Sequence, residues 1–249
     1  MSGRLDPRVR RVLITGGGSG VGADLARGFA AEGAEVVICG RREAPLRSVA
    51  ERTGARVILA DVTDEGEVAR LFAEAGPCEV VIANAGQADS APFGRTTLAQ
   101  WNAMLAVNLT GVFLTFREGL RQFDGWGRLL AVASTAGLKG YAKVAPYAAA
   151  KHGVMGLVRS LALEVARGPV TVNAICPGFL DTEMTAQTIR VIVEKTGRSP
   201  EEARAALEGL SPQNRLYRPD EVTSAALWLC GPGAEGVNGQ AITISGGEA

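Results

Sequence analysis

The segment "RVLITGGGSGVG" (residues 11–22) decides the fold, because it joins a short apolar run to a glycine-rich turn. Its first five residues predict a buried strand, and the pattern after the turn predicts a helix up to about residue 32. Gly16, Gly20 and Gly22 are spaced as TGxxxGxG. Glycines let a backbone turn sharply beside a phosphate, and a helix N-terminus offers that anion free N–H groups. The segment therefore predicts a nucleotide-binding turn, with a plain tight turn as the alternative.

The same alternation of short strands and longer helices continues along the chain. Further strands are predicted at 34–39, 55–60, 78–83, 127–134, 169–175 and 240–245, and helices at 20–32, 44–53, 64–75, 98–122, 146–167 and 219–230. Repeated strand–helix units form a parallel sheet that helices cover on both faces. Since no linker or repeat divides the chain, we expect one α/β domain over residues 1–249. Its expected fold is a Rossmann-like, doubly wound sheet of about seven strands.

Residues 180–215 interrupt the alternation, because they contain no strand pattern. They predict a helix near 181–196 and a second one that begins in "SPEEARAALEG". In this second helix Ser199 is a suitable N-cap, Pro200 suits the first helical position and Glu202 completes a capping box. The pair follows a strand end, where open α/β sheets bind their ligands. We therefore expect a substrate lid over about 180–215, with a decorative insertion as the alternative.

Composition narrows the class of protein. The 249 residues are 47% hydrophobic and 21% charged, and 26 basic residues balance 26 acidic ones. Zero net charge argues against nucleic acid or an anionic membrane as a partner. The N-terminus "MSGRLDPRVRR" lacks a signal-peptide core and no apolar run reaches ~18 residues, so we expect a cytoplasmic protein. The cysteines, expected as free buried thiols without metal or disulfide, are Cys39, Cys78, Cys176 and Cys230.

The segment "PYAAAK" (residues 146–151) places a tyrosine and a lysine four residues apart. On a helix, Tyr147 and Lys151 are then neighbours, about 5–6 Å apart at Cβ. An ammonium beside a phenol favours the phenolate, so we expect Lys151 to lower the pKa of Tyr147 and make it a usable acid or base. A packed tyrosine with a solvated lysine is the alternative. His152 lies about 100° further round the helix, where a structural or surface role is expected.

Several motifs occur together in one order along the chain. They are TGxxxGxG at 15–22, "DV" at 61–62, "NAG" at 84–86, Asn108, Ser134, the YxxxK of Tyr147 and Lys151, and "PG" at 177–178. With these motifs the chain resembles the short-chain dehydrogenase/reductase family over essentially its whole length. That resemblance implies an enzyme that interconverts a ketone and a secondary alcohol with a nicotinamide cofactor.

The resemblance also implies roles for four catalytic residues. Ser134 would hold the substrate oxygen by a hydrogen bond, and Tyr147 would donate the proton. Lys151 would support Tyr147 and bind the cofactor ribose, while Asn108 would hold a water that relays protons to Lys151. The cofactor-binding residues implied in the same way are Thr15, Gly16, Gly18, Ser19, Gly20, Val21, Gly22, Gly40, Arg41, Arg42, Asp61, Val62, Asn84, Ala85, Gly86, Asn108, Tyr147, Lys151, Pro177, Gly178 and Thr182.

The end of the second predicted strand, "VVICGRR" (residues 36–42), bears on the choice of cofactor. An NAD-preferring enzyme usually places a carboxylate there for the ribose hydroxyls. This chain has the neutral Gly40, followed by Arg41, whose guanidinium can grip a phosphate, and by Arg42. We therefore expect NADP(H) to be preferred, with NAD(H) possible. Two solvated arginines are the alternative.

The segments "APYAAAKHGVMGLVRSLALEVA" (145–166) and "NAICPGF" (173–179) most resemble 3-oxoacyl reductases and aromatic-polyketide ketoreductases. This implies a 3-oxoacyl thioester or a polyketide-like ketone as substrate. "QADSAPF" (87–93) departs from the glycine-rich stretch usual in the polyketide enzymes. Two alternatives stay open: a secondary alcohol dehydrogenase acting on a small or cyclic alcohol with NAD(H), and a non-catalytic dinucleotide-binding scaffold.

A homotetramer is expected from one helix in particular. The predicted helix 146–167 is apolar nearly all round, so it needs cover on more than one side. In the family that the chain resembles, this helix joins helix 98–122 in a subunit interface.

Overall fold

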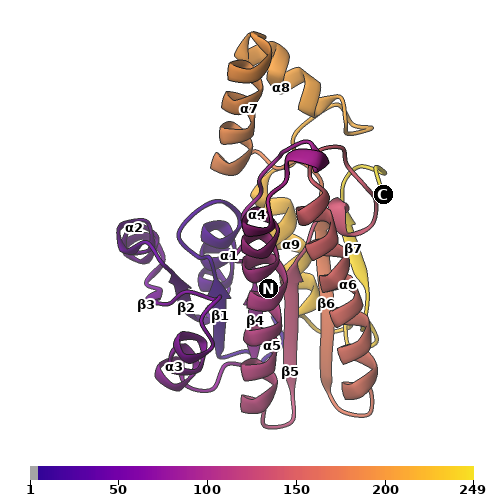
Figure 1. The fold of residues 1–249 in the computed structure, drawn as a ribbon. Helices are drawn as coiled ribbons and strands as arrows, with labels where there is room; N and C mark the ends of the chain where they lie inside the picture. Colours follow the sequence, from indigo (N-terminus) through magenta and orange to yellow (C-terminus); the bar gives the residue numbers. More distant parts are fainter. Residues whose placement is uncertain (1–4) are drawn as a thin grey trace.

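The computed structural model describes residues 5–249, so residues 1–4 of the predicted 1–249 domain lie outside the described residues. Its strands are β1 (Arg11–Thr15), β2 (Glu35–Gly40), β3 (Arg56–Leu59), β4 (Val80–Ala83), β5 (Gly127–Val132), β6 (Val170–Pro177) and β7 (Ala241–Ile244). They form one parallel sheet in the order β3-β2-β1-β4-β5-β6-β7 (Figure 1). The predicted doubly wound, Rossmann-like sheet is confirmed. Its strand order reverses between β1 and β4, and ligands bind beyond the carboxyl ends of strands at such a point.

Helices fill the connections nearly where they are predicted. They are α1 (Gly20–Ala31), α2 (Glu43–Thr53), α3 (Glu65–Ala75), α4 (Leu98–Leu105), α5 (Gly111–Gln122), α6 (Ala145–Val165), α7 (Glu183–Thr196), α8 (Pro200–Glu208) and α9 (Pro219–Leu229), with 3₁₀ turns η1 (Phe93–Arg95) and η3 (Thr135–Gly137). The expectation of one regular helix over 98–122 is wrong. A π-helical turn, η2 (Ala106–Thr110), separates α4 from α5 and carries the buried Asn108.

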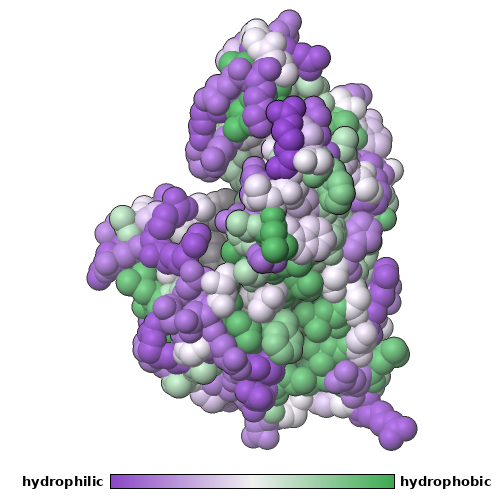
Figure 2. Space-filling model, in the orientation of Figure 1, coloured by the Kyte–Doolittle hydropathy of each residue, from purple (hydrophilic) through white to green (hydrophobic). Residues whose placement is uncertain are grey.

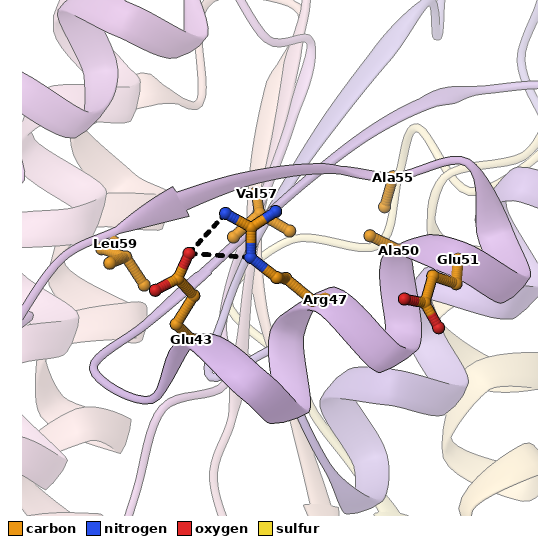
Figure 3. A pocket seen from close by; sticks show the side chains of 7 residues that line it. All are labelled: Glu43, Arg47, Ala50, Glu51, Ala55, Val57 and Leu59. Carbon is orange, nitrogen blue, oxygen red and sulfur yellow. Dashed lines mark hydrogen bonds and ion pairs between the residues drawn. The ribbon is translucent and has the colours of Figure 1, made fainter.

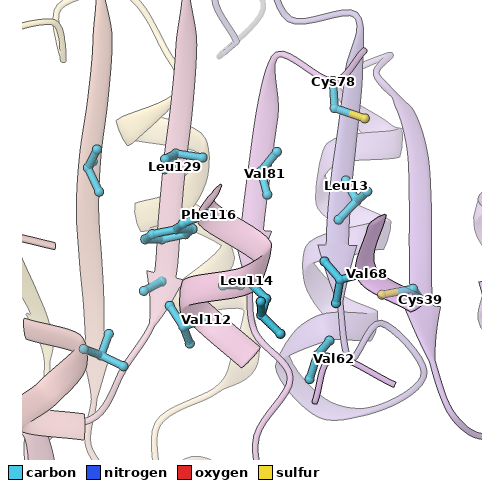
Figure 4. Close-up of a cluster of buried hydrophobic side chains, with 14 of the residues drawn as sticks. Leu13, Cys39, Val62, Val68, Cys78, Val81, Val112, Leu114, Phe116 and Leu129 are labelled. Carbon is cyan, nitrogen blue, oxygen red and sulfur yellow. The ribbon is translucent and has the colours of Figure 1, made fainter. Parts of the chain in front are cut away.

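Two apolar layers hold the helices against the sheet. Alternate strand residues face opposite sides: Leu13 lies in one cluster, whereas Val12 and Ile14 lie in the other. The first cluster packs α3, α5 and α6 on the sheet, and Figure 4 shows Val112 and Phe116 of α5 beside the strands. The second packs α1, α2 and α9 on the other face. Burying each such side chain stabilises the fold by about 1.5–3 kcal/mol. Packing on both faces therefore fixes the positions of the strand ends.

Helices α7 and α8 stand beyond the carboxyl edge of the sheet (Figure 1). The predicted capping box is present, because the Ser199 side chain accepts from the Glu202 N–H and Glu202 bonds back to the Ser199 N–H. The described residues 180–215 contain no strand, and only an isolated bridge joins Leu180 to Tyr217. The predicted helical insertion is therefore confirmed as structure.

Three further expectations concern what the described chain lacks. Within residues 5–249 all four cysteines are buried and unpaired, as predicted. No group of three or more potential metal ligands occurs in the same part of the chain. None of its helices combines the length and apolar character needed to cross a membrane.

Candidate active site

The glycine turn between β1 and α1 is closed against the end of β4. Gly16 has a φ of +66°, and a Cβ on it would lie 2.8 Å from the Ala85 Cα. A Cβ on Gly22 would lie only 2.2 Å from the Gly16 oxygen. The Thr15 hydroxyl accepts from the backbone N–H groups of Asn84 and Ala85, both at 3.0 Å. The Asn84 amide donates back to the Thr15 and Gly16 carbonyls. The predicted turn and the "NAG" segment therefore form one unit.

The start of α1 has the features of an anion site. Ser19 is its N-cap, but the Ser19 side chain caps no N–H group within residues 5–249. The first N–H groups of a helix have no intrahelical partner, so those of α1 can serve a phosphate. Thr182, the N-cap of α7, lies beside the turn, because a Cβ on Gly20 would be 3.5 Å from its Cγ2. The bare turn, its uncapped helix and the neighbouring Gly18 and Val21 fit a dinucleotide pyrophosphate.

The end of β2 brings the two predicted arginines to the same edge. Gly40 is half-buried, and both Arg41 and Arg42 are exposed. Arg41 Nη1 lies 3.7 Å from Asp61 Oδ2, with 65% of the Arg41 side chain exposed. Asp61 Oδ1 also accepts from the backbone N–H and the hydroxyl of Thr63. Partial burial opposes ionisation, but these hydrogen bonds and Arg41 keep the pKa of the Asp61 carboxyl below its usual value. Asp61 thus carries a negative charge beside Arg41.

Asn108 is completely buried in the π-helical turn. Its amide nitrogen donates to the Gln87 carbonyl at 2.9 Å and to the Met104 carbonyl at 3.1 Å, and its oxygen accepts from the Gln87 N–H. A Cβ on Gly86 would lie 2.9 Å from Asn108 Oδ1 and 3.9 Å from Lys151 Nζ. Asn108 and Lys151 therefore flank the last residue of "NAG", where only a glycine fits.

A glycine is also required directly after the π-helical turn, at Gly111. Val62 is buried in the core, and a Cβ on Gly111, directly after the π-helical turn, would lie 2.8 Å from Val62 Cγ2. Val62 thus packs α5 against the end of β3, in addition to its expected position near the adenine.

Ser134, Tyr147 and Lys151 meet beyond the end of β5. Ser134 is the N-cap of η3 and its hydroxyl accepts from the Ala136 N–H at 3.1 Å. The same side chain is near enough to the Tyr147 phenol to counteract part of the rise in the pKa of Tyr147. Lys151 Nζ lies 5.6 Å from the centre of the Tyr147 ring and donates to the Val132 carbonyl at 2.9 Å. The fold therefore brings together the three residues that the motifs predict.

The expected effect of Lys151 on Tyr147 is wrong for this arrangement. Burial raises the pKa of Tyr147, and the Ser134 hydrogen bond lowers it only in part. Burial also lowers the pKa of Lys151 from its usual 10.5 to about 8. Lys151 does not lower the pKa of Tyr147 because its Nζ donates to the Val132 carbonyl and lies over the phenol ring. The ammonium is itself desolvated there, and Tyr147 holds its proton firmly.

The remaining predicted residues fall where expected. Pro177 ends β6, and a Cβ on Gly178 would lie 3.2 Å from the ring of the buried Tyr217. His152 is exposed on α6, away from the site, and its Nδ1 contacts the Ala148 carbonyl at 2.9 Å. Sequence reasoning missed Tyr217, and also the Val132 and Gln87 backbone groups that bind Lys151 and Asn108. Backbone carbonyls carry no residue signature, so no motif could have indicated them.

The surface has hollows at two places on this side of the molecule. Figure 2 shows a notch between helices α7 and α8 and the part of the molecule that contains α2. A separate hollow of about 380 Å³ lies between α2 and β3 (Figure 3). It is lined by Glu43, Arg47, Ala50, Glu51, Ala55, Val57 and Leu59, none of them a predicted catalytic residue. The Glu43–Arg47 ion pair spans it.

Comparison with known proteins gives consistent matches over the whole chain. A family model described as enoyl-(acyl carrier protein) reductase matches residues 16–248. A D-beta-hydroxybutyrate dehydrogenase of Cupriavidus necator is 34% identical, covering 96% of this chain and 97% of that protein. An acetoacetyl-CoA reductase of Shinella zoogloeoides is 35% identical, covering 96% and 98%. The crystal structure of a single-substitution variant of actinorhodin polyketide ketoreductase with NADPH superposes with a TM-score of 0.91, at 34% identity and 98% coverage of both chains.

Proposed function

The chain belongs to the short-chain dehydrogenase/reductase family and is an oxidoreductase of CH–OH and ketone groups, and on that premise we propose that it is an NADP(H)-dependent reductase of 3-oxoacyl thioesters or similar ketones with an apolar tail. The predicted family and enzyme class are confirmed. The observation that carries the proposal is the buried Lys151 over the Tyr147 ring, with the Ser134 side chain next to the same phenol. This set argues against a non-catalytic scaffold.

The site residues supply the proton chemistry of a carbonyl reduction. A substrate oxygen placed between Ser134 and Tyr147 accepts hydrogen bonds from both hydroxyls. Because its pKa is raised, Tyr147 keeps its proton until negative charge develops on that oxygen, and then donates it. Lys151, with a pKa of about 8, can return a proton to Tyr147 near neutral pH. A dinucleotide whose pyrophosphate the glycine turn holds would supply or accept the hydride through its nicotinamide.

NADP(H) preference is part of the proposal, and Arg41 supports it. Its guanidinium is exposed beyond β2 and lies 3.7 Å from the nearest Asp61 oxygen, so it can turn toward a 2′-phosphate without rearranging the backbone. Gly40 leaves room, because a Cβ there would only touch Leu46 at 3.7 Å. The name of the similar actinorhodin ketoreductase structure includes NADPH.

A substrate with an apolar tail suits the side of the site opposite α1. Residues Asp89, Thr96 and Pro146 line one small hollow, which places the segment after "NAG" beside the residue preceding Tyr147. Phe93 in this segment is 73% exposed, and Met184 at the start of α7 is 47% exposed. Exposed apolar side chains of this kind can cover a hydrocarbon tail. A second candidate function is the oxidation of a small hydroxy acid with NAD(H), and the similarity to a D-beta-hydroxybutyrate dehydrogenase supports the hydroxy acid.

The lid and the tetramer are further proposals. Helix α7 begins directly after Thr182, next to the glycine turn, and α8 follows it, so movement of the two helices would cover or free the site. Phe113 of α5 and Leu163 of α6 are exposed large apolar residues, and Figure 2 shows an apolar patch over these two helices. A second copy of the chain would cover that patch.

A substrate panel with one variant tests the function. We expect the protein to oxidise NADPH in the presence of acetoacetyl and longer 3-oxoacyl thioesters. Tyr147→Phe keeps the ring but removes the proton, so its rate should fall on the order of 10²–10⁴-fold. Cofactor binding, followed by NADPH fluorescence, should be unchanged. Oxidation of 3-hydroxybutyrate with NAD as the best reaction would favour the second candidate, and full activity of the variant would refute the proton-donor role.

A further inference from the structure

The last residues of the chain return to the substrate side of the site. The Glu248 side chain is only 3% exposed and forms an ion pair with Lys139 Nζ at 3.0 Å. Its carboxylate also accepts a hydrogen bond from the Tyr141 hydroxyl, 107 residues away in sequence. A buried carboxylate costs free energy unless it is paired and hydrogen-bonded. Both partners of Glu248 come from the loop that begins at Ser134.

The contact continues as far as Thr135, the residue directly after Ser134. The Tyr141 hydroxyl and Thr135 Oγ1 are 2.7 Å apart. Because the phenol donates its single proton to Glu248, its oxygen accepts the proton of the Thr135 hydroxyl. Thr135 is buried and directly follows Ser134. Two successive hydrogen bonds therefore join the Glu248 side-chain carboxylate, through Tyr141, to Thr135.

The same carboxylate touches the loop that leads into the lid. A Cβ on Gly178 would lie 3.1 Å from Glu248 Oε2. The next residue, Phe179, meets Tyr141 edge to face, with ring centres 6.3 Å apart and an angle of 87°. Both rings are half-buried, so part of each is accessible. Tyr141 and Phe179 thus form an aromatic wall whose two halves come from different loops and meet around Glu248.

We propose that Glu248 is a positioning residue: it holds the Tyr141–Phe179 wall beside Ser134 and thereby sets which ketones the site accepts. This inference rests on the proposed function. A small ketone needs only the Ser134 and Tyr147 hydroxyls, whereas a larger one also packs on the aromatic wall. Loss of the carboxylate leaves Tyr141 without its acceptor and Lys139 without its counter-charge. The wall then moves, and larger ketones are affected most.

Substrate selectivity tests this role. Glu248→Gln keeps the size of the side chain and one acceptor oxygen but removes the charge and the second acceptor, so it weakens the hold on both Lys139 and Tyr141. Tyr141→Phe removes the donor. For each variant, kcat/KM for the largest ketone turned over should fall about 10-fold through KM, with less than about 3-fold loss for the smallest. The double variant should lose less than the product of the two single losses, because both substitutions weaken the Tyr141–Glu248 contact. Glu235→Gln, at an exposed carboxylate between α9 and β7, is the matched control. Equal loss for all ketones, or additive losses, would overturn the proposal.

Hydrogen exchange gives a readout that needs no turnover. In Glu248→Gln, backbone amides of residues 135–141 and 178–180 should exchange several-fold faster than in the unmodified protein, whereas Glu235→Gln should leave them unchanged. Unchanged exchange in Glu248→Gln refutes the positioning role even if no ketone is turned over, an outcome that would refute the proposed function separately. If Glu248→Gln does not fold, Tyr141→Phe is measured in the same two ways.

Discussion

The buried ammonium of Lys151 should make stability depend on pH in a way that one substitution removes. Lys151 is 3% exposed, and burial lowers its pKa from 10.5 to about 8. One pKa unit corresponds to 1.36 kcal/mol, so charging this lysine in the folded protein costs about 3 kcal/mol more than in the unfolded chain. Lys151→Met keeps most of the apolar stem and cannot be charged.

The sign follows from the order in which the two states bind the proton. Above a pH of ~10.4 Lys151 is neutral in both states, and the penalty is absent. As the pH falls from there to about 8, the unfolded chain binds the proton first, so the free energy of unfolding decreases. Below a pH of about 8, Lys151 is charged in both states and the whole cost of burying its charge applies. Relative to the unmodified protein, Lys151→Met should therefore gain about 3 kcal/mol between pH ~10.5 and pH ~7. Loss of the bond to the Val132 carbonyl costs about 1 kcal/mol at every pH and leaves this slope unchanged.

Urea unfolding of both proteins without cofactor, at several pH values across that range, measures the difference directly. Taking the variant minus the unmodified protein cancels the other groups that titrate. Lys195→Met, at an exposed lysine on α7, is the control and should show no such slope. A Lys151→Met difference that stays constant within about 0.5 kcal/mol across the range would refute the assignment of a desolvated ammonium. The same variant should have lost activity, so stability and catalysis would move in opposite directions.

The remaining predictions concern the cofactor, the lid and the assembly. Arg41→Ala should reduce the NADPH-to-NADH ratio of kcat/KM about 10-fold, the lower end for a charged hydrogen bond because Arg41 is 65% exposed. Arg52→Ala, at an exposed arginine of α2, is its control, and an unmodified enzyme that prefers NADH would contradict the NADP assignment. Hydrogen exchange in residues 183–208 should slow when cofactor and a substrate analogue bind, whereas unchanged exchange would indicate a rigid decoration. Light scattering should give the mass of four chains, reduced by Leu163→Glu, and a monomer mass at micromolar concentration would refute the tetramer.

Much of this protein could be predicted from the sequence because the relevant signals are local. The strand–helix alternation follows from side-chain periodicity, and it gives the sheet and the element bounds to within a few residues. The glycine turn depends on the missing Cβ at positions such as Gly16 and Gly22, which the sequence shows directly. The four-residue spacing of Tyr147 and Lys151 gives their shared helix face by helix geometry alone. Even the capping box of α8 could be predicted, since its residues are three apart.

Only the tertiary structure decided the electrostatics and the long-range contacts. The spacing of Tyr147 and Lys151 indicated that they are neighbours, but the direction of each pKa shift depends on desolvation by surrounding atoms. Lys151 points to the Val132 carbonyl because β5 ends beside α6, which no local pattern encodes. In the same way, Glu248 meets Tyr141 across 107 residues of sequence. Burial and contacts of this kind are properties of the assembled fold, since each depends on which distant atoms exclude water from a group.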